Sequence, residues 1–167
     1  MTSDEQGVTK DRYVLIPRTL IFITHGERVL LLKGAPNKRL WANQYNGVGG
    51  HVERGEDVLT AAKRELSEET GLSIPDMWLS GIVTVDTGQE VGIGIYIFRG
   101  ESSGGELIPS PEGNLEWIPM MELNQLPLVE DLITILPLVL SRKRIESPFF
   151  AHYSYDKDGQ LSISFDK

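Results

Sequence analysis

The feature that most constrains the fold is a glycine-rich loop followed at once by an acidic helix. Residues 57–70 contain neither glycine nor proline, and Gly71 follows them. A glycine after such a run ends a helix readily, because it adopts the left-handed backbone conformation. The pair Gly49-Gly50 lets the backbone approach another segment closely and leaves a carbonyl oxygen free to coordinate, and Gly55 permits a turn. We therefore expect this loop to meet the helix at one site.

Three glutamates of the predicted helix are spaced to share one face. Glu65, Glu68 and Glu69 stand three and four residues apart, and carboxylates this close repel one another unless a cation lies among them. One interpretation is a solvated acidic face, softened by Lys63 and Arg64. The other is a site for Mg²⁺ or Mn²⁺, which prefer oxygen ligands. Zinc is disfavoured, because the chain has three scattered histidines and no cysteine.

The remaining pattern predicts strands around two helices. Hairpins are expected at 19–33, 78–99 and 149–165, with a short strand at 115–119. A second helix is expected over 129–145, kinked or broken by Pro137. This order favours an α/β fold in which helices pack on a mixed sheet. Residues 1–12 are expected to be a mobile tail, and 13–167 a single domain.

Composition excludes several classes of function. The chain has 167 residues and a net charge of −8, which disfavours binding to nucleic-acid polymers or to anionic membranes. The absence of cysteine excludes disulfides and thiolate nucleophiles. The N-terminus lacks the apolar core of a signal peptide, and the most apolar stretch, 126–140, is too short to span a bilayer. We expect a cytoplasmic protein, either monomer or homodimer.

The spacing of the loop and helix resembles the Nudix box at every fixed position. It reads Gly50-x5-Glu56-x7-Arg64-Glu65-Leu66-x-Glu68-Glu69-x-Gly71-Leu72. The order of strands and helices is similar to a whole Nudix domain. The resemblance implies an α/β/α sandwich with a central mixed β-sheet, and hydrolysis of a phosphoanhydride bond in a nucleoside diphosphate linked to a group X. It also implies Mg²⁺, with Mn²⁺ as the alternative cofactor.

The same resemblance assigns roles in the site by position. Glu65 and Glu69 would be the main metal ligands, Glu68 a further ligand, and the Gly49 carbonyl would complete the set. Arg64 would orient the carboxylates, with Glu56 as its partner. Which glutamate is the general base stays open.

Family members often use one more glutamate from outside the box. Glu112, in the loop before the 115–119 strand, is the candidate here for catalysis and metal binding. The alternative is a charged loop tip.

Residues outside the box point to the substrate. The stretch 45–50, Tyr-Asn-Gly-Val-Gly-Gly, is similar to one in the oxidised-purine nucleoside triphosphatases. In that subfamily the asparagine contacts the purine edge, and an amide offers both a donor and an acceptor. Alternatively, Asn46 is a turn residue that tolerates unusual backbone angles.

The C-terminal third strengthens this similarity. An acidic residue ahead of the late helix recognises the base in those enzymes, and Glu130 and Asp131 are the candidates for substrate binding. The alternative is that acidic residues simply favour the first turn of a helix. Aromatic residues could also stack on a base, although most aromatics in a domain of this size are core. The aromatic candidates for stacking are Phe22, Trp41, Tyr45 and Trp117.

These observations give three hypotheses. The first is metal-dependent hydrolysis of an oxidised purine nucleoside triphosphate such as 8-oxo-dGTP, giving a monophosphate and pyrophosphate, which would sanitise the nucleotide pool. The second is a Nudix hydrolase of ADP-ribose or another X-linked nucleoside diphosphate. The third is a non-catalytic nucleotide-sensing module. Such modules usually lose box glutamates, whereas all three remain here.

Overall fold

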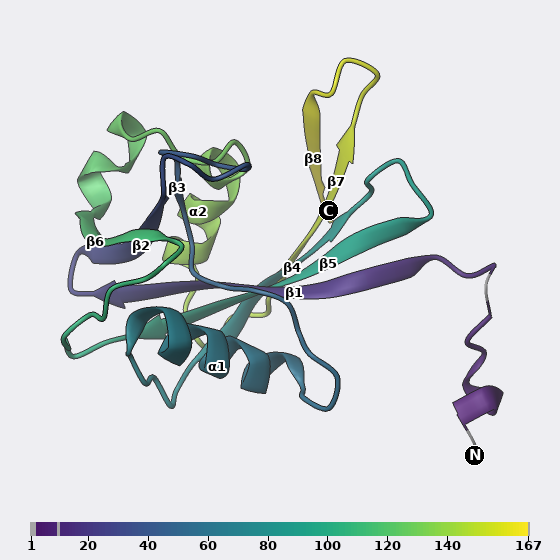
Figure 1. The fold of residues 1–167 in the computed structure, drawn as a ribbon, viewed down its shortest axis with the longest axis horizontal. Coiled ribbons are helices and arrows are strands. Elements are labelled where there is room, and N and C mark those ends of the chain that lie inside the picture. The colour runs from purple at the N-terminus through teal and green to yellow at the C-terminus, as the bar shows by residue number, and fades with distance from the viewer. Residues whose placement is uncertain (1–2, 10, 167) are drawn as a thin grey trace.

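The structure, a computed structural model, describes residues 3–9 and 11–166 and is built on one mixed sheet (Figure 1). The strands are β1 (Val14–His25), β2 (Arg28–Gly34), β3 (Tyr45–Asn46), β4 (Trp78–Val85), β5 (Val91–Glu101), β6 (Gly113–Pro119), β7 (Phe149–Tyr155) and β8 (Leu161–Phe165). The helices are α1 (Val58–Thr70) and α2 (Leu132–Ser141), with 3-10 turns η1 (Ser3–Gln6) and η2 (Met120–Gln125). The predicted tail over 1–12 includes residues 1, 2 and 10, which lie outside the described residues.

Two parallel pairings make the sheet mixed. The strand order is β3-β2-β1-β5-β4-β7-β8, and β6 also pairs with β2. Strands β1 and β5 run parallel from the pair Val14–Val91 to the pair Thr24–Glu101, and β4 runs parallel to β7. The three predicted hairpins are present as the antiparallel pairs β1–β2, β4–β5 and β7–β8. Strand β1 begins five residues before the expected start at 19, because it pairs with β5 from Val14 to Thr24.

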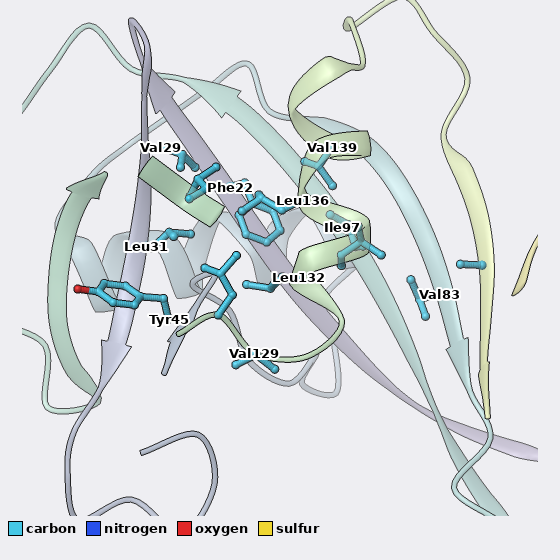
Figure 2. Packing of buried hydrophobic residues seen from close by; sticks show 14 of the residues in the cluster. Phe22, Val29, Leu31, Tyr45, Val83, Ile97, Val129, Leu132, Leu136 and Val139 are labelled. Carbon is cyan, nitrogen blue, oxygen red and sulfur yellow. The ribbon is translucent and has the colours of Figure 1, made fainter. Parts of the chain in front are cut away.

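Each face of the sheet carries a helix, because neighbouring residues of a strand point to opposite faces. Ile21 and Ile23 of β1 belong to the apolar cluster that includes Leu66 of α1. Phe22, between them, belongs to the other cluster, with Leu132 of α2 (Figure 2). Figure 1 shows α1 and α2 on opposite sides of the sheet. The predicted α/β/α sandwich is confirmed.

Local signals fix both ends of α1. Asp57 is the N-cap, and its carboxylate accepts hydrogen bonds from the backbone N–H groups of Leu59 and Thr60. Gly71 ends the helix with φ 77°, and its N–H donates to the Ser67 carbonyl. The helix expected over 57–70 is therefore found almost unchanged.

Helix α2 is shorter than the expected 129–145. At its start, the helix begins at Leu132, and the Val129 N–H before it donates to the Tyr45 carbonyl at the end of β3. At its end, Arg142 adopts an extended backbone. Pro137 lies inside the helix on its exposed side and does not break it, so the break, one of the two expected outcomes, is not found. No helix within the described residues has the length and apolar character needed to cross a membrane.

Candidate active site

The glycine-rich loop runs along β1. The Thr19 N–H donates to the Gly50 carbonyl at 2.8 Å, and the Ile21 N–H donates to the Val48 carbonyl at 2.7 Å. Gly49 has φ 153°, and a Cβ atom there would lie 2.2 Å from the Thr19 carbonyl oxygen. Only glycine fits so close to the strand, which explains the backbone approach that the sequence suggested.

The second glycine of the pair makes room for a helix side chain. A Cβ atom on Gly50 would lie 2.4 Å from Oε1 of Glu65. The Glu65 carboxylate therefore packs directly on the loop backbone. This contact joins loop and helix at one site, as the glycine-rich sequence predicted.

Arg64 organises the carboxylates around it. Its Nε and Nη2 atoms donate to Glu56 at 3.1 and 2.7 Å, so the pair expected from the spacing forms. Its Nη1 atom donates to Glu65 at 2.8 Å and to Glu68 at 3.2 Å. Nη2 also donates to the backbone carbonyl of His51, whose side chain is exposed. The hydrogen bonds from Arg64 lower the pKa of Glu56, which keeps this pair ionised.

Glu69 is the carboxylate with the most unusual surroundings. Its Oε2 atom is buried and has no hydrogen-bond partner among the residues that the structure describes. Burial, followed by repulsion from Glu65 and Glu112, raises the pKa of Glu69 to about 7, against an opposing hydrogen bond from the Gly49 backbone. A buried acceptor without a donor is costly unless a cation or a proton satisfies it.

Glu112 joins this end of the site from the loop before β6. Its backbone carbonyl accepts from the Ala35 N–H at 3.2 Å, and its side chain forms an ion pair with Lys38. Glu112 and Glu69 line the same cleft. Glu112 is thus not an isolated loop tip, although its role stays a prediction.

The residues at this end suit a hard divalent cation. Within the described part of the chain, no three acidic or histidine side chains are already gathered as a metal site. Glu68 is 61% exposed and bonded to Arg64, and Glu112 is held by Lys38. The available donors are nonetheless all oxygens, and the Oε2 atom of Glu69 lacks a partner. This arrangement fits Mg²⁺ or Mn²⁺ held by a few carboxylates together with substrate phosphates.

A cleft of about 510 Å³ runs from this acidic end to a second group of polar residues. Gly49, Glu69 and Glu112 line one end. Asn46 and Asp131, from β3 and from the start of α2, line the same cleft. Its size suits a small-molecule ligand.

Asn46 lies in strand β3, paired with Leu32. Trp41 and Asn43 are the non-glycine residues with positive φ in the described part of the chain, so Asn46 does not need its side-chain type for an unusual backbone angle. Its Oδ1 atom accepts from the Gly47 N–H at 2.8 Å. The amide nitrogen is therefore the group that remains to donate to a ligand.

Of the two acidic candidates near α2, Asp131 is the more buried and is held by a hydrogen bond. Both line the cleft, but Glu130 is exposed whereas Asp131 is partly buried. Asp131 accepts a hydrogen bond from the Tyr153 hydroxyl at 3.2 Å, and burial raises the pKa of Asp131. It occupies the N-cap position of α2 without a side-chain capping bond, so the preference of acidic residues for a helix start stays the alternative to a role in binding.

Tyr153 was missed by sequence reasoning. Its place in β7 follows an alternation in which residues 149, 151 and 153 are buried. Among the four aromatic candidates, Phe22 and Tyr45 are core residues. Trp117 packs near the ring of His25, and Trp41 lines the cleft with 41% of its surface exposed.

A glycine-rich loop packed against an acidic helix, at one end of a cleft, is typical of hydrolases that act on phosphate anhydrides. The NUDIX domain model matches residues 14–139, and the chain belongs to the Nudix hydrolase family of enzymes acting on acid anhydrides. The predicted family and enzyme class are confirmed.

Two curated relatives and one solved structure are similar to this chain over most of its length. The oxidized purine nucleoside triphosphate hydrolase of Mus musculus is 32% identical over 151 residues, covering 87% of this chain and 91% of the relative. The protein of that name from Danio rerio is 32% identical over 127 residues, covering 75% and 80%. The crystal structure of a mutator MutT protein from Bacillus halodurans is similar with a TM-score of 0.77 and 29% identity, covering 91% and 98%.

Proposed function

We propose that this protein hydrolyses oxidised purine nucleoside triphosphates, with 8-oxo-dGTP as the representative substrate, to the monophosphate and pyrophosphate. The observation that carries the proposal is the single cleft that joins Glu69 and Gly49 to Asn46 and Asp131. The names of the two similar hydrolases from Mus musculus and Danio rerio support the substrate class.

Nudix enzymes generally depend on a divalent metal, and the box residues fit one. Glu65, Glu69 and the Gly49 carbonyl would hold Mg²⁺ or Mn²⁺, with Glu68 and Glu112 as further candidates. When bound, such a cation neutralises phosphate charge and lowers the pKa of an attacking water.

The chain's own residues position the reacting groups. Arg64 fixes the Glu65 and Glu68 carboxylates through Nη1. The Oε2 atom of Glu69 has no donor within the fold, so it is available to a cation or to a proton leaving water. Hydrolysis of a phosphoanhydride needs charge stabilisation and orientation more than covalent help from the protein.

The other end of the cleft would read the base. The Asn46 amide nitrogen can donate to a purine acceptor. The Asp131 carboxylate accepts a hydrogen bond from Tyr153 and keeps further acceptor capacity for an N–H group of a purine. Trp41, half-exposed in the cleft, offers an aromatic face for the ring.

The test is a product assay on purified protein with Mg²⁺. The panel contains 8-oxo-dGTP, the four standard deoxynucleoside triphosphates, ADP-ribose and a dinucleoside polyphosphate, with products resolved by chromatography. We expect selective conversion of 8-oxo-dGTP to its monophosphate, and we expect Asp131→Ala to lose this selectivity more than its activity on pyrimidine triphosphates. Preferential cleavage of ADP-ribose would overturn the substrate assignment and leave the box chemistry in place.

A further inference from the structure

We propose a second ligand site, for a phosphate group, at the C-terminal end of α2. A cavity of about 580 Å³ lies there and shares no lining residue with the catalytic cleft. Its lining comes from the start of β4, the end of β5 and the segment after α2. The cavity's charged residues are Arg99, Arg142, Lys143, Arg144, Asp76 and Glu101. Four cations against two carboxylates stand out in a chain with 24 acidic and 16 basic residues.

Two of these arginines are held rigidly by the fold. Arg99 faces Trp78 across the β4–β5 pairing, with its guanidinium 5.4 Å from the indole ring. Its Nη1 atom donates to three carbonyls at the end of α2, those of Val139, Leu140 and Arg142. Arg142 lies over the Phe149 ring at 5.6 Å, and its Nη1 atom donates to the Ser147 carbonyl. A ligand would therefore meet guanidinium groups that are already positioned.

Donors without acceptors gather around this cavity. Five buried side-chain polar atoms have no hydrogen-bond partner in the described part of the chain. Three of them are N–H donors on lining residues: Trp78 Nε1, Arg99 Nε and Arg142 Nε. A buried donor left unpaired costs stability, so such a group calls for a ligand or water that supplies the acceptor. All three are donors on residues of a cavity whose charged residues are mostly cations, so an anion is the ligand class that would complement them.

The balance of charge selects the ligand class. Asp76 pairs with Arg144 at 3.4 Å, so these two largely offset each other. Glu101 then faces Arg99, Arg142 and Lys143, which leaves an excess of positive charge. Guanidinium groups bind phosphate oxygens with good geometry, and a tetrahedral phosphate presents acceptors in several directions. We infer that the ligand is orthophosphate or the phosphate of a nucleotide.

The experiment measures phosphate binding to the metal-free protein by calorimetry, in chelator and at constant ionic strength set with sodium chloride. Arg142→Gln removes an orphaned donor and a cation, and Arg144→Gln is the matched control, because Arg144 is already paired with Asp76. We expect Arg142→Gln to weaken phosphate binding at least tenfold and Arg144→Gln to change it less than threefold. Equal affinity in the wild type and in Arg142→Gln would overturn the site, as would the absence of phosphate binding.

A second variant tests the site in case Arg142→Gln fails to fold. Trp78→Phe keeps a ring beside Arg99 but deletes the Nε1 donor, and we expect it to weaken phosphate binding several-fold with an unchanged circular dichroism spectrum. An unchanged affinity in this folded variant would contradict the role of Trp78. Titration with AMP distinguishes a nucleotide ligand from free phosphate. If AMP binds more tightly than orthophosphate and this binding is lost in Arg142→Gln, the ligand is a nucleotide. If AMP and orthophosphate bind equally, the ligand is free phosphate. The proposal does not depend on the proposed substrate, because phosphate binding is measured without turnover.

Discussion

The Tyr153 hydroxyl donates a hydrogen bond to the Asp131 carboxylate at 3.2 Å and so joins β7 to the first turn of α2. Tyr153 is only 3% exposed, so its ring is fixed by the core. The position of Asp131 in the cleft therefore depends on a residue that sits 22 positions further along the chain.

Tyr153→Phe is expected to impair recognition of the base. The variant keeps the buried ring but removes the donor, and a hydrogen bond to a charged group contributes about 1.5–3 kcal/mol. We expect kcat/KM for 8-oxo-dGTP to fall about tenfold or more, mostly through KM, with little change for a pyrimidine triphosphate. Tyr155→Phe is the matched control, because Tyr155 also lines the cleft but is 51% exposed. Equal losses in both variants, or on both substrates, would contradict the positioning role.

Glu69→Gln is expected to abolish most of the activity. It keeps the size of the side chain but weakens the oxygen donor that the fold leaves without a partner. Loss of a group that handles protons or charge in the transition state typically costs 10²–10⁴-fold, and we expect about 10³-fold in kcat. Product release is measured by chromatography, with the exposed Glu90→Gln as control. A rate equal to that of the wild type would show that the acidic end of the cleft is not the reaction site.

Gly50→Ala is expected to separate activity from stability. The new Cβ atom would lie 2.4 Å from Oε1 of Glu65, but this is the far end of a flexible side chain and can move. We expect about a tenfold loss of activity, with a change in unfolding free energy of less than ~1 kcal/mol. Gly94→Ala, whose Cβ would meet Leu15 at an ordinary 3.6 Å, serves as control in urea unfolding and in the product assay. Full activity in Gly50→Ala would disprove the need for close packing between loop and Glu65.

Arg64→Lys is expected to destabilise the site although it keeps the charge. Arg64 donates to Glu56, Glu65, Glu68 and a backbone carbonyl from one planar group, which an ammonium cannot reproduce. We expect a loss of about 1–3 kcal/mol in unfolding free energy, together with reduced activity. The measurement is urea unfolding, and Lys63→Arg, the reverse exchange at the exposed neighbour, should change little. If Arg64→Lys were as stable and active as the wild type, the organising role would be ruled out.

Asp131→Asn is expected to change how stability depends on pH. Burial raises the pKa of Asp131 in the folded state, so folding favours its protonated form. The stability associated with this group is fully present below the ordinary aspartate pKa of about 4 and is lost as pH rises through the folded pKa. Asparagine never ionises, so the variant should gain on the wild type as pH rises from about 3.5 to 7.5. Urea unfolding of the metal-free proteins measures this, and a constant difference across that range would contradict it.

The elements with local end signals could be predicted from sequence. Helix α1 begins after a capping Asp57 and ends at Gly71, so its bounds followed from nearby residues. Helix α2 was overextended, because the apolar spacing continues past both ends. Long-range hydrogen bonds lie at those ends: the Val129 N–H donates to Tyr45 of β3, and Arg99 donates to carbonyls of the last turn. Such partners are distant in sequence and leave no local pattern.

In the candidate site, too, residues with a local sequence pattern could be predicted, whereas those that depend on long-range packing could not. The box residues lie within 23 positions and were found by their spacing, and Arg64 does meet Glu56. Asn46, Glu130 and Asp131 were named by similarity, and the structure lines one cleft with all three. Tyr153 escaped notice, because its importance arises only when β7 packs beside the start of α2. Of the four aromatic candidates, Trp41 lines the cleft and Phe22 is buried in the core, and composition does not distinguish the two.

The two ends of the cleft are supplied by different parts of the chain. The acidic end comes from the glycine loop, α1 and the loop before β6, whereas Asp131 and Tyr153 come from the start of α2 and from β7. A protein engineer could randomise the second group and leave the first untouched, since distant sites with no shared partners contribute almost additively. New substrates could in this way be sought on an unaltered reaction centre, with each variant retaining the means of hydrolysis before any selection begins.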